Sequence, residues 1–350
     1  MRVPHHASRR PAAQARVGWL VEAMIDIHSH VVPDGLPFGL NGDARWPVLQ
    51  RDAGYGDVVI AGRLFRRVSR DSWDMDSRRE AMAAAGVTHQ VLSPMPELFS
   101  YWAKPSDANR FCTAINEWTA DRVHADRVSF SGLGIVPAQD IDLACEALAS
   151  LKQLGLSGVE LGSMVGERPV TDALYRPLFA EAERLGLCVL VHAFHPIHER
   201  YVPAGMAANG ATFPIESTFA AAAVVVNGLS RGLPDLRLAF SHGGGGTALT
   251  AWRLEHLWNT VPQFAETLAE SPLTTLRKFF YDSLLYDGDA IRYLVGVLGA
   301  RAVCVGTDYP FFEMRAGISP LLDAVVEPAT RSLVTQDNAR RFLAFDPMAE

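Results

Sequence analysis

Met24-Ile25-Asp26-Ile27-His28-Ser29-His30 is the stretch that decides the fold, because it reads as a short apolar strand ending in two alternate histidines. Side chains two residues apart in a strand lie on the same face. Two imidazoles on one face at the end of a strand can bind one metal ion. The stretch therefore predicts a buried strand that carries two ligands of a metal site.

Three later segments repeat this arrangement. His192 follows the apolar run 188–191, His242 follows the run 236–241, and Asp308 follows the run 302–307. A histidine after a strand is more often a hydrogen-bonded structural residue, and an HxH pair alone recurs by chance. The repetition of one architectural position is more informative, because a (β/α)₈ barrel carries its chemistry at the carboxyl ends of its strands.

Helical and strand-like segments alternate from Met75 onward. After the strand 24–27, the expected strands are 87–92, 130–136, 158–161, 187–191, 236–241, 279–282 and 302–306, and the expected helices are 76–85, 106–125, 141–154, 172–185, 214–229, 247–261 and 287–298. Such alternation predicts a parallel sheet with right-handed crossovers. Eight units predict a closed (β/α)₈ barrel. A doubly wound open sheet is the alternative, but no Gly-rich phosphate turn follows the first strand.

The domain organisation follows from this pattern. Residues 24–350 are expected to form one barrel domain, and the Gly-rich stretch 31–74 is expected to be an insert after the first strand, with a small hairpin around 58–65. Residues 1–23 are basic and lack the long apolar segment of a secretory signal. They are interpreted as a disordered N-terminal extension.

Composition indicates the class of protein. Hydrophobic residues make up 49% and charged residues 20% of the 350 residues, as in a soluble enzyme. The net charge of -7 argues against a nucleic-acid partner, and no apolar run is long enough to cross a membrane. The four cysteines include no CxxC pair, which predicts free thiols and a cytoplasmic location.

The candidate ligands indicate metal-assisted chemistry. His28, His30, His192 and Asp308 form a mixed nitrogen and oxygen set that suits zinc or a similar divalent ion. A water molecule or the substrate would fill the open coordination position, and a bound water would have its pKa lowered toward ~7. We expect His242 to be a nearby acid or base rather than a ligand, and Asp308 to relay a proton as well as bind metal.

Two further features bear on this site. The strand 158–161 carries no lysine of the kind that bridges two metals in related barrels, so one metal is favoured. The run Gly243–Gly246 could cradle phosphate, but it lacks the Walker lysine and the GxGxxG spacing. We interpret the run as close backbone packing beside His242 that leaves room for a substrate.

Four residues are candidates for substrate binding. Arg66 lies with Arg67 in the long loop, either as a solvated pair or as a clamp for a carboxylate. Arg253 could serve likewise, with a surface ion pair as the alternative. Phe311 is expected to line the pocket wall, and Trp102 is a further candidate, with packing as the alternative.

Several motifs occur together in one order. They are Ile25–His30, Phe65-Arg66, Trp73-Asp74, Phe99–Pro105, Val191-His192, His242–Gly245 and Gly306–Phe311. With these segments the chain from Met24 onward resembles the metal-dependent decarboxylase branch of the amidohydrolase superfamily, and within it the 2-amino-3-carboxymuconate-6-semialdehyde decarboxylase group. The Phe99–Pro105 and Gly306–Phe311 segments are the specific ones.

The resemblance implies a zinc ion, or manganese or cobalt, on the four ligands named above. It implies that His242 helps to deprotonate metal-bound water and that Arg66 contacts the carboxylate of a small carboxylic acid. The implied reaction is oxygen-independent decarboxylation of an unsaturated or aromatic acid, in a homodimer. Two routes stay open: activated water assists at the unsaturated carbon, or the substrate binds the metal and Asp308 protonates the ring.

Two departures from the family pattern concern the substrate. Val261 stands where a partner subunit of close relatives donates a second arginine, and Ala193-Phe194-His195-Pro196 replaces a Pro-Trp sequence. A substrate with one recognised carboxylate, or a more apolar aromatic acid, is therefore expected. The alternative functions are a metal-dependent hydrolase or hydratase of a lactone, amide or enol, and a non-catalytic barrel with structural metal. The last is disfavoured, because a closed structural site would not need His242.

Overall fold

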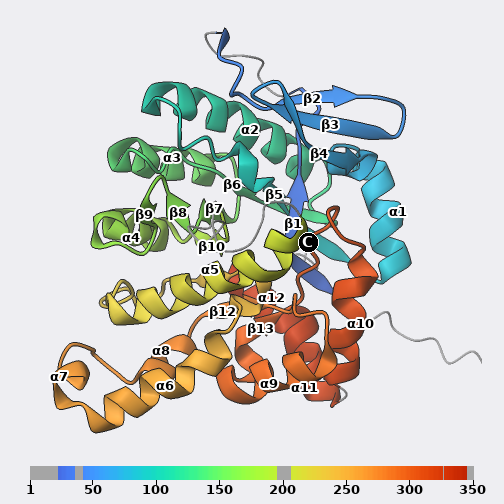
Figure 1. The fold of residues 1–350 in the computed structure, drawn as a ribbon. Coiled ribbons are helices and arrows are strands. Elements are labelled where there is room, and N and C mark those ends of the chain that lie inside the picture. Colours follow the sequence, from blue (N-terminus) through green and yellow to red (C-terminus); the bar gives the residue numbers. More distant parts are fainter. Residues whose placement is uncertain (1–22, 36–41, 195–205, 326, 345–350) are drawn as a thin grey trace, which may run out of the picture.

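The computed structural model describes residues 23–35, 42–194, 206–325 and 327–344. Its centre is a barrel of eight parallel strands with helices around it (Figure 1). The strands lie in the order β1 (Ile25–Val31), β5 (His89–Pro94), β6 (Phe130–Gly134), β7 (Gly158–Gly162), β10 (Cys188–His192), β11 (Leu238–Phe240), β12 (Phe280–Asp282) and β13 (Val303–Cys304). Apart from Ala23, the predicted extension 1–23 lies outside the described residues.

The barrel closes between its last and first strands. The amide of Ile27 donates to the carbonyl oxygen of Val305 at 2.9 Å, and a parallel bridge joins Ser29 to Tyr309. Spatial order equals sequence order, as right-handed βα units require. The predicted (β/α)₈ barrel is confirmed.

Seven helices follow the strands near the predicted positions. They are α1 (Met75–Ala85), α2 (Pro105–Ala125), α3 (Ile141–Gln153), α4 (Arg176–Leu185), α5 (Met206–Val226), α6 (Thr247–Thr260) and α9 (Gly288–Leu298). Asp74 begins α1 by accepting a hydrogen bond from the Ser77 amide at 3.0 Å, and Gly86 ends it in the left-handed conformation.

The predicted start of α5 at Pro214 is wrong, because the helix begins at Met206 and contains the proline. A proline usually marks the first turn of a helix, since it lacks an amide proton. Here the Pro214 carbonyl oxygen accepts a hydrogen bond from the Thr218 hydroxyl at 2.8 Å. One missing backbone donor is tolerated inside this long helix.

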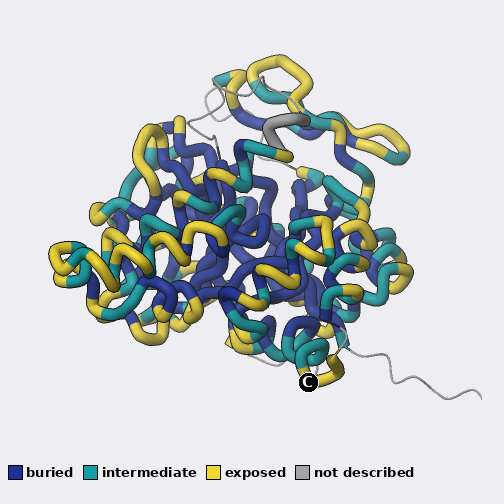
Figure 2. The backbone as a smooth tube through the Cα atoms, turned by 60° about the horizontal axis from the view of Figure 1, so that its bottom comes forward, coloured by how far each residue is buried: buried dark blue, intermediate teal, exposed yellow. Residues whose placement is uncertain are grey.

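The chain after α9 closes the amino end of the barrel. Three helices that the sequence did not predict follow β13: α10 (Met314–Ala324), α11 (Pro328–Ser332) and α12 (Asn338–Leu343). Two more unpredicted helices, α7 (Pro262–Ala265) and α8 (Pro272–Leu276), lie between α6 and β12. Phe342 and Leu343 of α12 pack in one cluster with Ile25, Ile27 and inward side chains of other strands. Figure 2 shows this interior as a continuous buried region under an exposed outer surface.

A small antiparallel sheet lies between β1 and α1. It consists of β2 (Val48–Arg51), β3 (Tyr55–Ile60) and β4 (Arg63–Ser69), and it lies beside the barrel in Figure 1. Ala61 and Gly62 form the turn between β3 and β4 with φ of 52° and 73°. A second pair, β8 (Met164–Val165) and β9 (Arg168–Pro169), follows β7. The sheet matters for function because β4 carries Arg66.

Two expectations from composition can be checked against the structure. No helix in the described ranges is long and apolar enough to span a membrane. The cysteines are free, and Cys112, Cys188 and Cys304 are buried while Cys145 is partly buried. The prediction of free thiols thus agrees with the structure.

Candidate metal centre and substrate pocket

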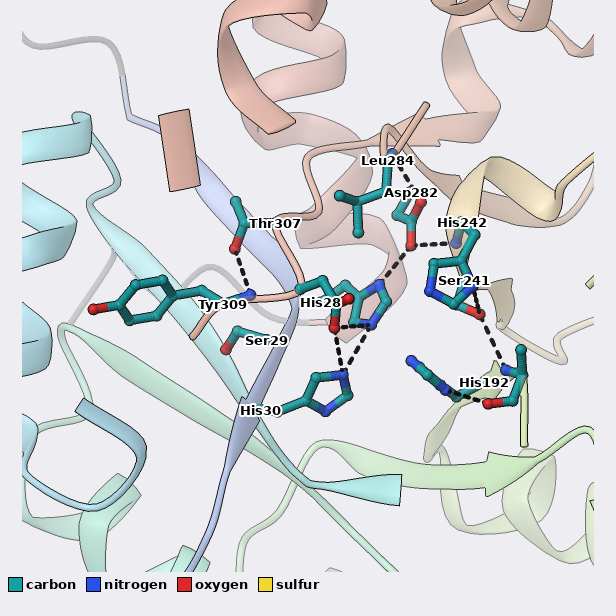
Figure 3. Close-up of polar contacts among 12 residues, drawn as sticks. His28, Ser29, His30, His192, Ser241, His242, Asp282, Leu284, Thr307 and Tyr309 are labelled. Atoms are coloured by element: carbon teal, nitrogen blue, oxygen red, sulfur yellow. Dashed lines mark hydrogen bonds and ion pairs between the residues drawn. The ribbon is translucent and has the colours of Figure 1, made fainter. Parts of the chain in front are cut away.

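Three histidines and one aspartate converge at the carboxyl ends of the strands. One ligand atom from each of His28, His30, His192 and Asp308 lies within 4.8 Å of the others, and all four residues are buried. The Nε2 atoms of His28 and His30 are 3.1 Å apart, and Asp308 Oδ1 lies 3.0 Å from His30 Nε2. Figure 3 shows the imidazoles of His28 and His30, which both come from β1, converging with that of His192 from β10.

The pairing of β1 with β5 contains an irregularity that aims the two β1 histidines. Ile25 and Ile27 point into the barrel interior with the other core residues. Strict alternation would then turn His28 away from that interior. The register shifts between Asp26 and Ser29, and such a bulge re-aims the following side chains.

Asp308 is placed by hydrogen bonds between the end of β13 and β1. The amides of Thr307 and Asp308 both donate to the His28 carbonyl oxygen, at 3.1 and 2.9 Å. Asp308 has a φ of 56°, a conformation that residues other than glycine adopt rarely and mostly at functional sites. The backbone conformation thus positions the Asp308 carboxylate beside the histidines.

The four side chains fit a divalent ion by their protonation and by their unpaired atoms. His192 donates from Nδ1 to the Ala193 carbonyl oxygen at 2.8 Å, and its buried Nε2 has no hydrogen-bond partner among the described residues. Burial lowers the pKa of His30 to about 4 and that of His192 well below its usual value. Both imidazoles are therefore neutral at pH 7, as metal ligands must be. Three nitrogens and one carboxylate suit zinc and comparable ions.

Asp282 orients the His28 imidazole through the ring nitrogen that lies away from the other ligands. Its Oδ2 lies 2.6 Å from His28 Nδ1, which directs His28 Nε2 toward the other ligands. Burial opposes the charged imidazole, but the Asp282 hydrogen bond, with the charges of Asp282, Asp308 and Glu160, outweighs it and raises the pKa of His28 to about 9. In the metal-free protein at neutral pH, His28 is the ligand that must lose a proton before binding metal.

We expect the apparent metal affinity to increase about tenfold per pH unit from about pH 7 to pH 8.5, because one proton leaves His28 for each ion bound. Because the pKa of His28 is raised, the metal affinity keeps increasing with pH until His28 is deprotonated, and it becomes constant only above pH ~9. With an ordinary histidine the affinity would become constant above pH ~6.5. Competition with a chromophoric chelator would measure the slope. Asp282→Asn should move the plateau to lower pH, and a flat profile in both proteins would contradict the prediction.

His242 lies beside the ligand group but not in it. Its ring centroid is 5.0 Å from that of His192 and 5.6 Å from that of His28. Its Nδ1 lies 3.1 Å from Ser241 Oγ, and its amide donates to Asp282 at 2.8 Å. Burial, followed by the charge of His28, holds the pKa of His242 below its usual value. His242 is thus a neutral imidazole near the candidate metal.

The glycines after His242 allow close backbone packing. A Cβ atom on Gly245 would lie 1.7 Å from the Pro214 carbonyl oxygen, and one on Gly244 would lie 2.6 Å from the Tyr281 ring. Both glycines have positive φ, of 59° and 64°. These contacts confirm the interpretation of the run as tight packing against α5 and β12.

A cavity of about 520 Å³ opens onto these residues. His192, His242 and Asp308 form one part of its wall, and Arg66 and Phe311 another. The Arg66 guanidinium lies 4.2 Å from the centroid of the Phe311 ring, which itself stacks on His30 at 5.0 Å. Arg66 and Phe311 thus line the cavity, and their contact with a substrate stays a prediction.

Trp102 and Arg253 lie elsewhere, so the structure gives no support to their predicted contact with substrate. Neither is among the described residues that line the cavity. The Trp102 ring packs on Trp46, with centroids 4.8 Å apart, and lies under the Arg45 guanidinium. Arg253 is exposed on α6. Their local sequence did not specify which way they point.

Three buried or half-buried acids were not singled out from the sequence. Asp282 ends β12 just as His192 ends β10, and this shared position was the available signal. Glu160 on β7 lies 3.9 Å from His30 Nδ1, and burial raises its pKa well above the usual value. Glu97 lines the cavity and follows β5. Charged residues inside apolar strands or turns are rare and therefore informative.

A family model described as "Amidohydrolase" matches residues 25–345. The chain belongs to the amidohydrolase family. This amidohydrolase is 31% identical over 340 residues to a 2-amino-3-carboxymuconate-6-semialdehyde decarboxylase of Dictyostelium discoideum, and the match covers 92% of each chain. It is also 27% identical over 240 residues to a gamma-resorcylate decarboxylase of Rhodococcus jostii, covering 62% of this chain and 71% of the relative.

Solved structures confirm the fold of this amidohydrolase. The 5-carboxyvanillate decarboxylase LigW of Sphingomonas paucimobilis superposes with a TM-score of 0.77 at 22% identity, over 93% of this chain and 99% of that chain. A dihydroxybenzoic acid decarboxylase of Polaromonas sp. JS666, solved with bound manganese and 2-nitroresorcinol, superposes with a TM-score of 0.72 at 19% identity, over 92% and 97% of the chains.

Proposed function

We propose that this protein of the amidohydrolase family is a carboxy-lyase that uses one divalent metal to remove carbon dioxide from an unsaturated or aromatic carboxylic acid, without oxygen or an organic cofactor. The single observation that carries the proposal is a cavity shared by the histidine–aspartate group, His242 and an unpaired arginine, Arg66. The activities of the relatives support this reaction over hydrolysis or hydration on the same barrel.

Arg66 supplies the contact for the substrate carboxylate. Its guanidinium makes no ion pair or hydrogen bond with the described residues, although the side chain is only partly exposed. An arginine fork binds a carboxylate through two parallel hydrogen bonds. The Phe311 ring beneath the guanidinium supports it from one side.

His242 and Asp308 supply the proton transfers. When the carbon–carboxylate bond breaks, its electron pair stays on the substrate carbon, and a proton must replace carbon dioxide there. In the tautomer in which Nδ1 donates to Ser241 Oγ, His242 Nε2 has a lone pair that accepts and returns a proton. Asp308 lines the same cavity and is the second group able to deliver a proton to the substrate carbon.

His28, His30, His192 and Asp308 would hold the metal, and zinc is the ion we propose. A bound divalent ion would polarise a coordinated oxygen atom and would lower the pKa of a coordinated water molecule. Manganese and cobalt are alternatives, and manganese is bound in the Polaromonas decarboxylase. Elemental analysis of protein purified without added metal tests the assignment.

The free cysteines support our further proposal of a cytoplasmic location.

The test of the reaction is a panel of unsaturated and aromatic carboxylic acids, with lactones, amides and enols of similar size, incubated with metal-loaded protein. Products are identified by mass. Loss of carbon dioxide from an acid supports the proposal and identifies the substrate class. Gain of water by a lactone, amide or enol, with no acid decarboxylated, would instead make the protein a hydrolase or hydratase.

We further propose a homodimer formed through α5 and α6. These neighbouring helices present four large apolar side chains that are between 45% and 68% exposed: Ile215, Phe219, Leu249 and Trp252. Clustered exposed apolar residues mark association surfaces. Trp252→Glu is expected to convert the dimer to a monomer in light scattering after gel filtration.

The control for this variant is Val128→Glu, which places the same charge at another exposed apolar residue, in the loop between α2 and β6. It should leave the dimer intact. A wild-type protein that is monomeric at micromolar concentration, or a dimer that tolerates Trp252→Glu, would exclude this surface as the interface.

A further inference from the structure

Glu97 is an acidic residue in the pocket wall that has no role in the chemistry above. It lies in the 3₁₀ turn Pro96–Leu98, directly after the carboxyl end of β5. The amide of Leu98 donates to the Met95 carbonyl oxygen at 2.8 Å, and the side chains of Met95 and Leu98 are fully buried. Packing of its neighbours therefore holds Glu97 at one place in the wall.

One carboxylate oxygen of Glu97 lacks a partner. Its Oε2 is buried and has no hydrogen-bond partner in the described part of the chain. Burial raises the pKa of the Glu97 carboxyl, against the lowering effect of the Arg66 charge. A buried polar oxygen without a hydrogen bond costs free energy. Because Glu97 also lines the ligand cavity, a ligand bound there can come within reach of its carboxylate.

The cavity is thus lined by two groups of opposite charge, the Arg66 guanidinium and the Glu97 carboxylate, which has one unpartnered oxygen. Arg66 presents donors only, and the Glu97 carboxylate presents acceptors. Asp308, the other acid in the wall, belongs to the metal group. Arg66 is the only lysine or arginine among the described lining residues, so a second carboxylate that does not bind the metal would find no second side chain of this kind there.

We infer that Glu97 is a specificity-determining residue: Arg66 takes the substrate carboxylate, while Glu97 accepts a hydrogen bond from a hydroxyl or amino substituent and excludes a second carboxylate. The inference rests on the proposed function, because it uses Arg66 as the carboxylate contact. Buried acceptors discriminate strongly against ligands that leave them unpaired, and like charges close together disfavour the wrong ligand.

Binding to the metal-loaded protein tests the inference without requiring turnover. The probes are benzoate, the hydroxybenzoates, the aminobenzoates and the benzenedicarboxylates, each with its second group at the ortho, meta or para position. Titration calorimetry gives their affinities. Probes are compared that carry different second groups at the same ring position, so the ring and the first carboxylate are the same in each comparison.

In wild type, the best hydroxy or amino probe should bind about tenfold or more tighter than the dicarboxylate substituted at the same position. Glu97→Gln keeps the size and removes the charge, so it should reduce this ratio about tenfold. Glu97→Leu removes the acceptor, so the hydroxy probe should bind no better than benzoate.

The matched control is Glu167→Gln, at an exposed glutamate in the turn between β8 and β9. It should leave all ratios unchanged. Metal content and the midpoint of thermal unfolding show whether the Glu97 variants are folded. An unchanged ratio in Glu97→Gln, or an equal loss for every probe including benzoate, would overturn the inference. The panel of acids, lactones, amides and enols decides the reaction separately, so decarboxylation without this selectivity would leave the proposed function intact.

Discussion

Replacement of His242 with asparagine is expected to lower kcat by about 10²–10⁴-fold on the acid that the panel identifies, which is the range of general acid–base catalysis. Asparagine keeps a polar side chain beside Ser241 but cannot accept and return a proton. Metal content should stay at the wild-type level, because His242 is outside the group of four ligands. Steady-state kinetics and elemental analysis of the same preparation measure both quantities.

The control is His256→Asn, the same substitution at an exposed histidine on α6. It should leave kcat unchanged. If His242→Asn retains full activity, His242 has no part in the mechanism. If it loses metal together with activity, His242 acts on the metal centre rather than on the substrate, and the assignment of the proton-transfer step to Nε2 is wrong.

Removal of the metal by a chelator is expected to abolish turnover, with a loss of about 10³-fold or more, because several kcal/mol of charge stabilisation disappear. Zinc or manganese should restore the activity. Thermal unfolding provides a second measurement: an ion present at 100 times its Kd stabilises the native state by about 2.7 kcal/mol. The midpoint should fall on chelation and recover on reloading.

The matched variants are Asp308→Ala, which removes the anionic ligand, and Asp121→Ala, which removes an exposed aspartate on α2. The first should bind metal weakly and show no rise in the unfolding midpoint when metal is added. The second should behave as wild type. Full activity in chelated protein with no detectable metal would refute metal dependence.

The candidate site was predictable because its chemistry follows local periodicity. His28 and His30 are two residues apart in a strand, and His192 and Asp308 end later apolar runs. A parallel barrel brings all strand ends to one edge, so residues remote in sequence meet there. The start of α5 was mispredicted because proline is most common in the first turn of a helix, whereas Pro214 lies inside α5.

Residues whose role depends on side-chain direction were not predictable. Trp102 turns toward Trp46, and Arg253 turns to solvent, although both occur near motif residues. Glu97 stands in an apolar turn, and only the folded chain shows that it lines the same cavity as Arg66. No periodic pattern encodes such contacts, because loops and turns do not repeat.

The sequence by itself determined the eight-unit barrel and the convergence of three histidines and one aspartate, because strand alternation and βα repetition are properties of short segments. Only the tertiary structure decided that a bulge aims His28 and His30 together, that Asp282 holds His28, and that α12 seals the amino end of the barrel. It also decided that Arg66 and Glu97 share one pocket. These features depend on contacts between segments far apart in the chain, whose relative positions are set by packing rather than by local sequence.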